Sequence, residues 1–168
     1  MQLIFPTLAH KIAALDYRQE FFNHGVTAID GDAGLDEAPS YKFWLEVVQS
    51  APTRVHERYA PSSTFFAMVD DKIVGMVDIR HHLTDYLICV GGHIGYSVRP
   101  CERRKGYATK MLAMAVEKSR TFGIEKVLVT CNKDNISSAK TILRNGGVME
   151  NEFTEENGNV VQRYWITL

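Results

Sequence analysis

The stretch Val98-Arg99-Pro100-Cys101-Glu102-Arg103-Arg104-Lys105-Gly106-Tyr107-Ala108-Thr109 runs from the end of a predicted strand, through a basic turn, into the first turn of a predicted helix. A helix N-terminus leaves backbone N–H groups unpaired and carries about half a positive charge, so it attracts anions. Three consecutive cations strengthen that charge, and Gly106 lets a ligand approach the backbone without a Cβ in the way. The stretch predicts a site for a phosphorylated ligand; the alternative is an ordinary surface helix with a basic first turn.

The spacing of the glycines excludes two common nucleotide sites. The P-loop pattern G-x-x-x-x-G-K-[ST] does not occur, and Gly91, Gly92 and Gly95 do not have the spacing G-x-G-x-x-G of a dinucleotide-binding turn. The pattern that is present is Arg103-x-x-Gly106-x-Ala108, directly after a strand.

The flanking residues predict a strand, helix, strand, helix order around this loop. Residues 93–98 alternate and are rich in β-formers, while residues 108–122 carry apolar side chains at helical spacing before Gly123. Residues 126–131 form a short apolar run, and residues 136–144 have the pattern of a second helix. A helix between two such strands predicts that the strands are parallel neighbours.

These motifs resemble the GNAT superfamily of N-acetyltransferases, whose [Q/R]-x-x-G-x-[G/A] loop binds the pyrophosphate of acetyl-coenzyme A. The resemblance covers about residues 65–148 and is closest to predicted bacterial acetyltransferases with a G-G-H-I-G-Y-S-V-R-P strand and a last helix ending in N-G-G-V. It implies one α+β domain over residues 1–168, with a central mixed, mostly antiparallel sheet flanked by about four helices. The implied activity is acetyl transfer from acetyl-CoA to a primary amine of a small molecule or peptide. Transfer of another acyl group, and acyl-CoA binding without catalysis, remain alternatives.

The rest of the chain predicts two early helices and two hairpins. The first helix is expected over residues 9–24 with Ile12, Leu15, Gln19 and Phe22 on one side. The other expected elements are an opening strand over 1–5, a surface loop over 25–39, a helix over 41–49, a hairpin over 64–79, a continuation of the sheet over 87–98 and a hairpin over 148–166.

The resemblance also assigns the contacts to acetyl-CoA. Backbone N–H groups of the loop are expected to bind the pyrophosphate, and Arg103 or Arg104 can bond two phosphate oxygens at once. The strand end is expected to pair with the pantetheine arm like an added strand. Asn135 is expected near the same arm, with a helix cap as its alternative role. The full set is Val98, Arg99, Arg103, Arg104, Lys105, Gly106, Tyr107, Ala108, Thr109, Asn135 and Ser138.

Two catalytic groups follow from the same resemblance. A primary amine is mostly protonated at pH 7, so a base assists the reaction. His93 stands where many relatives carry a glutamate, and an imidazole is available as a base at pH 7. The alternative is a half-buried His93 that holds a neighbouring backbone group. The backbone N–H of Val98 is expected to polarise the thioester carbonyl. Ile142 replaces the tyrosine that often serves as the acid, so the acid stays unassigned.

Composition limits the partners. A hydrophobic content of 45% and a charged content of 23% are ordinary for a soluble globular protein, and a formal net charge of −1 argues against general nucleic-acid binding. No apolar stretch approaches about 20 residues, so no membrane span is expected. Three cysteines without C-x-x-C spacing suit a reducing cytoplasm. Arg80-His81-His82, taken together with His93, lacks the carboxylate or cysteine that would complete a metal site, and no metal is expected. The sequence does not decide whether the chain forms a homodimer.

Overall fold

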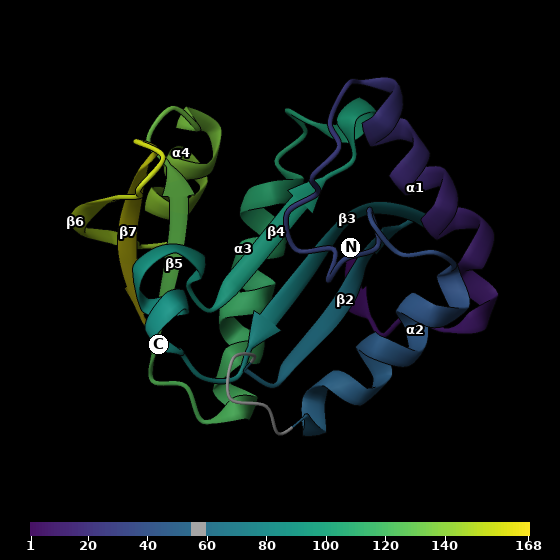
Figure 1. Cartoon of the computed structure of the whole chain (residues 1–168), viewed down its shortest axis with the longest axis horizontal. Coiled ribbons are helices and arrows are strands. Elements are labelled where there is room, and N and C mark those ends of the chain that lie inside the picture. Colours follow the sequence, from purple (N-terminus) through teal and green to yellow (C-terminus); the bar gives the residue numbers. More distant parts are fainter. Residues whose placement is uncertain (55–59) are drawn as a thin grey trace.

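The strands form two antiparallel sheets that diverge from a common point, as Figure 1 shows. The computed structural model describes residues 1–54 and 60–168. Within these residues the first sheet has the order β1-β2-β3-β4, made of β1 (Gln2–Ile4), β2 (Ser62–Val69), β3 (Lys72–Arg80) and β4 (Ile94–Val98). The second has the order β5-β7-β6, made of β5 (Lys126–Asn132), β6 (Val148–Thr154) and β7 (Val160–Thr167). Both predicted hairpins are confirmed.

Helices cover both faces of the first sheet (Figure 1). The α-helices of the described residues are α1 (Lys11–Asn23), α2 (Tyr41–Ser50), α3 (Tyr107–Ser119) and α4 (Ile136–Arg144). α1 and α2 bury one face through a core that includes Trp44 and Phe66. α3 buries the other face against Phe65 and Val77, and this core continues into β5 and β7. The α+β class, with two early and two late helices, is confirmed.

The expected parallel pairing of β4 with β5 is limited to hydrogen bonds between His93 and Leu128. The His93 backbone N–H donates to the Leu128 carbonyl at 2.7 Å, and the Leu128 N–H donates to Nδ1 of His93 at 2.9 Å. Beyond these bonds the two strands separate, so the expected mixed sheet is present as two antiparallel sheets (Figure 1). The separation opens the space in which the candidate site lies.

The helix predicted over residues 9–24 is present, but the predicted buried side was wrong. It begins with a 3₁₀ turn, η1 (Leu8–His10), and continues as α1. Ile12 is 83% exposed, whereas Tyr17 and Phe21 are buried. Apolar residues occur all round α1, so periodicity alone could not select a face. Tyr17 decides it, because its hydroxyl reaches the carbonyl of Ser97 at 3.2 Å.

Residues 87–91 do not continue the sheet, which corrects the expectation for this segment. They form a single π-helical turn, η3 (Leu87–Gly91), before β4. The Thr130 hydroxyl of β5 donates to the Val90 carbonyl and fixes the turn against the second sheet. Gly92 then redirects the chain at a φ of 62°, where a Cβ would lie 2.7 Å from the Leu128 carbonyl oxygen. Short 3₁₀ turns complete the fold at η2 (Ala51–Thr53), η4 (Pro100–Glu102) and η5 (Arg120–Phe122).

Candidate functional site

A cleft of about 960 Å³ lies where β4 and β5 separate. One wall is β4 with the loop that precedes α3, and the facing wall is the end of β5 with the first turns of α4. A third group of lining residues comes from the segment 26–31 and from η3. The volume is within the usual range for a small-molecule or cofactor site.

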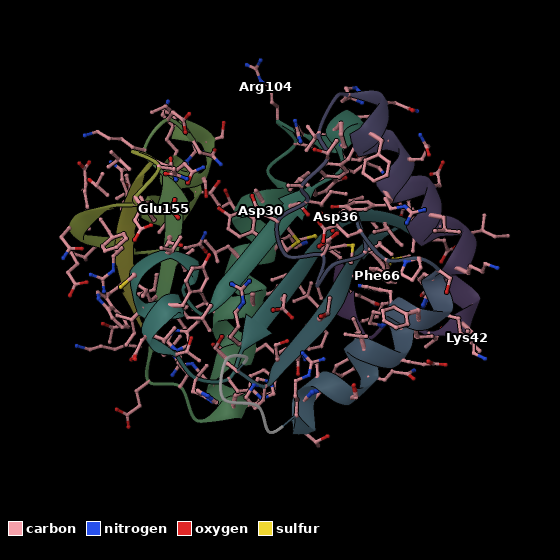
Figure 2. All side chains as sticks on the ribbon, viewed as in Figure 1. Asp30, Asp36, Lys42, Phe66, Arg104 and Glu155 are labelled. Atoms are coloured by element: carbon pink, nitrogen blue, oxygen red, sulfur yellow. The ribbon has the colours of Figure 1, made fainter. Side chains whose placement is uncertain are left out.

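The loop at the mouth of the cleft presents a row of backbone donors. The backbone N–H groups from Arg104 to Thr109 find no acceptor among the residues that the structure describes. Gly106 precedes α3 at a φ of 81°, and a Cβ built there would meet nothing within 4 Å. Figure 2 shows the Arg104 side chain extending from this loop at the edge of the molecule. A row of unpaired donors at a helix N-terminus is a site for a phosphate group.

The register of β4 leaves one of its edges open to the cleft. Arg99 donates its backbone N–H to the Val74 carbonyl at 2.9 Å, and β4 pairs with β3 without a register shift. Because alternate residues of an antiparallel pair bond inward, the backbone groups of Tyr96 and Val98 face away from β3. Nε of Arg103 donates to the Val98 carbonyl at 3.3 Å. The Val98 N–H is thus directed toward the cleft.

Two predicted contacts have side chains that are engaged elsewhere. Arg99 is 5% exposed, and its guanidinium pairs with Asp16 at 2.7 Å and with Glu20 at 3.2 Å. Because its N–H bonds to β3, Arg99 cannot pair with an extended ligand as expected. The Lys105 ammonium is 2.8 Å from a carboxylate oxygen of Glu102, so its charge is already paired. Neither residue lines the cleft, although Lys105 still contributes its backbone N–H to the row of donors.

Glu102 fixes the turn that precedes the donor row. It accepts hydrogen bonds from Lys105 at 2.8 Å and from Lys72 at 2.7 Å. These two ammonium groups lower the pKa of Glu102 to about 2, so the carboxylate stays ionised at every ordinary pH. The basic turn is therefore held by an ion-pair network and does not depend on a ligand for its shape.

The opposite wall brings α4 against β4. The Asn135 side chain accepts the backbone N–H of Ser138 at 3.0 Å, so the alternative role as a helix cap is confirmed, and both residues line the cleft. The Ser138 hydroxyl lies 2.8 Å from the Tyr96 hydroxyl. Burial raises the pKa of Tyr96 to about 12, which keeps the phenol protonated at neutral pH.

His93 has the structural environment considered above as the alternative. It is 6% exposed, does not line the cleft, and accepts the Leu128 N–H on Nδ1. Burial, with smaller contributions from the positive charges of Arg80 and His82, lowers the pKa of His93 to about 4. This geometry does not fit the predicted base, because the ring is a weak base directed at a backbone group.

Sequence reasoning missed two residues that the cleft contains, Tyr96 and Asp30. Strand alternation does separate Tyr96 from His93, and that signal could have directed attention to the phenol. Asp30 lies in a loop with no periodic pattern and is placed by a distant contact. The next residue, Gly31, packs on β4 so closely that a Cβ on it would lie 2.3 Å from the Gly95 carbonyl oxygen. Figure 2 shows Asp30 at the opening between the two sheets.

The fold and the donor row define a protein of the acetyltransferase class. The chain belongs to the acetyltransferase (GNAT) family, whose sequence model matches residues 32–146. The search of curated proteins by sequence gave no match.

Solved structures share the fold over nearly the whole chain. A ribosomal L7/L12 alpha-N-protein acetyltransferase in complex with coenzyme A is 17% identical with a TM-score of 0.72, over 99% of this chain and 93% of that one. A microcin C7 self-immunity acetyltransferase in complex with acetyl-CoA and AMP is 19% identical with a TM-score of 0.68, over 99% and 91%. A spermidine N-acetyltransferase from Vibrio cholerae is 15% identical with a TM-score of 0.64, over 99% and 95%.

Two further observations concern the described residues as a set. None of their helices combines the length and the apolar character needed to cross a bilayer. No three of their His, Cys, Asp or Glu side chains are placed together to hold a metal ion.

Proposed function

We propose that the chain is an acetyl-CoA-dependent N-acetyltransferase that acetylates a primary amine of a small molecule or peptide. The observation that carries this proposal is the row of unpaired N–H groups from Arg104 to Thr109, at the mouth of a cleft that leads to the open edge of β4. Family membership supports the same conclusion.

The chain offers a partner for each part of acetyl-CoA. The donor row suits the pyrophosphate, with Arg103 and Arg104 available to the phosphate oxygens. The open edge of β4 suits the amides of the pantetheine arm, which would add to this strand as an extended neighbour. Asn135 and Ser138 line the facing wall.

The neutral amine nitrogen bonds to the acetyl carbonyl carbon, the bond from that carbon to sulfur breaks, and the nitrogen releases one proton to water. Bound acetyl-CoA supplies the acetyl group as an activated thioester. The Val98 N–H faces the cleft, where it can donate to the thioester oxygen as negative charge develops there. Tyr96 can give its phenolic proton to the departing thiolate, since burial keeps that phenol protonated. His93 has no part in this scheme and holds β4 to β5.

The three cysteines bear on the compartment. Cys89, Cys101 and Cys131 are all free thiols in the structure. This supports the proposal that the enzyme acts in a reducing cytoplasm.

Calorimetric titration with acetyl-CoA, followed by a thiol-release assay against a panel of amines, tests the function. Binding together with amine-dependent release of coenzyme A is the expected result. Binding without turnover of any amine would favour a non-catalytic acyl-CoA-binding protein. Failure to bind acetyl-CoA at all would overturn the proposal.

A further inference from the structure

The end of the cleft away from the donor row has the composition of a pocket for an amine. Its walls include the apolar side chains of Leu87 and Val90 from η3 and of Ile94 at the start of β4. Two charged residues, Asp30 and Arg80, lie among them.

Asp30 is held in place by its neighbours in the chain. Gly31 packs on Gly95, and Asp32 accepts the backbone N–H groups of Gly34 at 2.8 Å and of Asp36 at 2.7 Å. The Asp32 carbonyl in turn accepts the indole N–H of Trp44 at 2.8 Å. These bonds fix the loop directly after its contact with β4, and Asp30 lines the cleft just before that contact.

The positive charge of Arg80 is already paired with groups of the protein itself. Its Nε lies 3.2 Å from a carboxylate oxygen of Asp78, and Nη1 donates to the Gly91 carbonyl at 3.0 Å. The guanidinium also lies against Gly95, at the point where the Asp30 loop crosses β4. The walls partly desolvate the Asp30 carboxyl and raise its pKa, and the nearby Arg80 partly offsets this. An acceptor here meets one carboxylate and one fixed cation.

Glu102, the other acidic residue among the described lining residues, is not available to a ligand. Glu102 lies beside the donor row, where it is paired with Lys72 and Lys105. Among the described residues that line the cleft, Asp30 is therefore the one carboxylate available to a positively charged ligand. A second charge on that ligand would be partly desolvated in the cleft without an anionic partner among these residues.

The two faces of β4 separate the groups further. The loop that carries Asp30 packs on Gly95. Successive residues of a strand face opposite sides, so this contact lies on the face of β4 opposite to the Tyr96 side chain. An amine held by Asp30 reaches the edge of β4 from one face, while the Tyr96 phenol serves the other. Acceptor and leaving group thus occupy different sides of the strand.

We propose that Asp30 attracts the acceptor in its ammonium form, which releases one proton to water before the nitrogen attacks, and that this pocket selects a primary amine with one positive charge and an apolar body over polyamines. The inference rests on the proposed function, because it identifies the acceptor of the same site. It distinguishes this chain from the spermidine N-acetyltransferase that shares its fold.

The selectivity of the unmodified enzyme is the first test. Hexylamine and 1,6-diaminohexane have the same carbon chain and differ by one ammonium group. We expect kcat/KM for hexylamine to exceed that for 1,6-diaminohexane by about tenfold, the effect of one partly desolvated charge without an anionic partner. Equal values, or a preference for the diamine or for spermidine, would overturn the proposal.

The second test removes the charge of Asp30. Asp30→Asn should weaken hexylamine binding to the enzyme–coenzyme A complex about tenfold in calorimetry, while the affinity for coenzyme A stays within twofold. Asp71→Asn, which removes a charge from the exposed turn between β2 and β3, is the control and should leave both affinities unchanged. Unaltered hexylamine binding in a folded Asp30→Asn protein would overturn the inference. Normal amine binding without thiol release would instead overturn the catalytic function and leave the amine site standing.

Discussion

The Nδ1 atom of His93 accepts the backbone N–H of Leu128 at 2.9 Å, at the point from which β4 and β5 diverge. A buried N–H that loses its acceptor costs about 1–3 kcal/mol. The imidazole is therefore part of the framework that keeps the cleft open.

Replacing His93 should lower stability more than catalysis. His93→Ala leaves the Leu128 N–H without its acceptor, and we expect the free energy of unfolding to fall by about 2–3 kcal/mol in urea titrations. His93→Asn supplies a side-chain oxygen in place of Nδ1 and should recover part of this loss. A kcat reduced about 100-fold with unchanged stability would return His93 to the mechanism as the base.

The stability of the protein should also depend on pH through His93. Its pKa is lowered from 6.5 to about 4 in the fold, so below pH 6.5 the unfolded chain takes up a proton that the folded chain refuses. Above pH 6.5 the titration of His93 does not change the free energy of unfolding. As the pH falls from 6.5 to 4, it lowers that free energy progressively, by about 3 kcal/mol. Urea titrations of the wild type and of His93→Asn across this range should show a steeper decline for the wild type. Parallel pH profiles would contradict the assignment.

A carboxylate in the donor row should abolish cofactor binding. Gly106→Glu places bulk and negative charge against the pyrophosphate, and we expect the Kd for acetyl-CoA to rise at least about 100-fold in calorimetry. Gly123→Glu is a matched control, because Gly123 also has a positive φ, 75°, and open space around it, but follows η5 away from the cleft. Comparable affinity in both variants would count against the loop as the binding site.

Replacing Arg104 and replacing Lys105 should change the affinity for acetyl-CoA by different amounts. Arg104 lines the cleft, so Arg104→Ala should weaken acetyl-CoA binding by about 3- to 10-fold and reduce its dependence on salt. Lys105→Ala should change the affinity by less than about twofold, since that ammonium is paired with Glu102. Calorimetry at two salt concentrations measures both. A larger effect at Lys105 than at Arg104 would contradict the observed orientations.

Removing the Tyr96 hydroxyl should slow the chemical step. For Tyr96→Phe we expect kcat to fall by about 10- to 100-fold, with little change in the KM for acetyl-CoA, because the phenol acts on the departing sulfur. Tyr164→Phe is the control, since the Tyr164 hydroxyl donates to Gln162 on the same strand of the second sheet. An unchanged kcat in Tyr96→Phe would remove the phenol from the mechanism.

The parts of the site that depend on local sequence were predictable. The basic turn, Gly106 and the start of α3 lie within a few residues of one another, so spacing and helix-terminus chemistry identified the donor row. The two hairpins were equally clear, because turn residues separate short alternating runs.

The parts that depend on distant contacts were not predictable in the same way. The buried side of α1 is chosen by Tyr17, which reaches Ser97 far along the chain. Asp30 enters the cleft because Gly31 packs on Gly95, and no short pattern encodes that approach. The choice between the two roles considered for His93 was open for the same reason, since its partner, Leu128, lies on a strand that local patterns would pair in parallel along its full length.

The seating of Gly31 on Gly95 has a consequence for how such an enzyme can change. That junction joins main chain to main chain, so it does not involve the side chain at position 30, which lines the proposed acceptor pocket. Amine preference can therefore drift by exchange of one side chain, while the machinery that grips the cofactor is inherited unaltered.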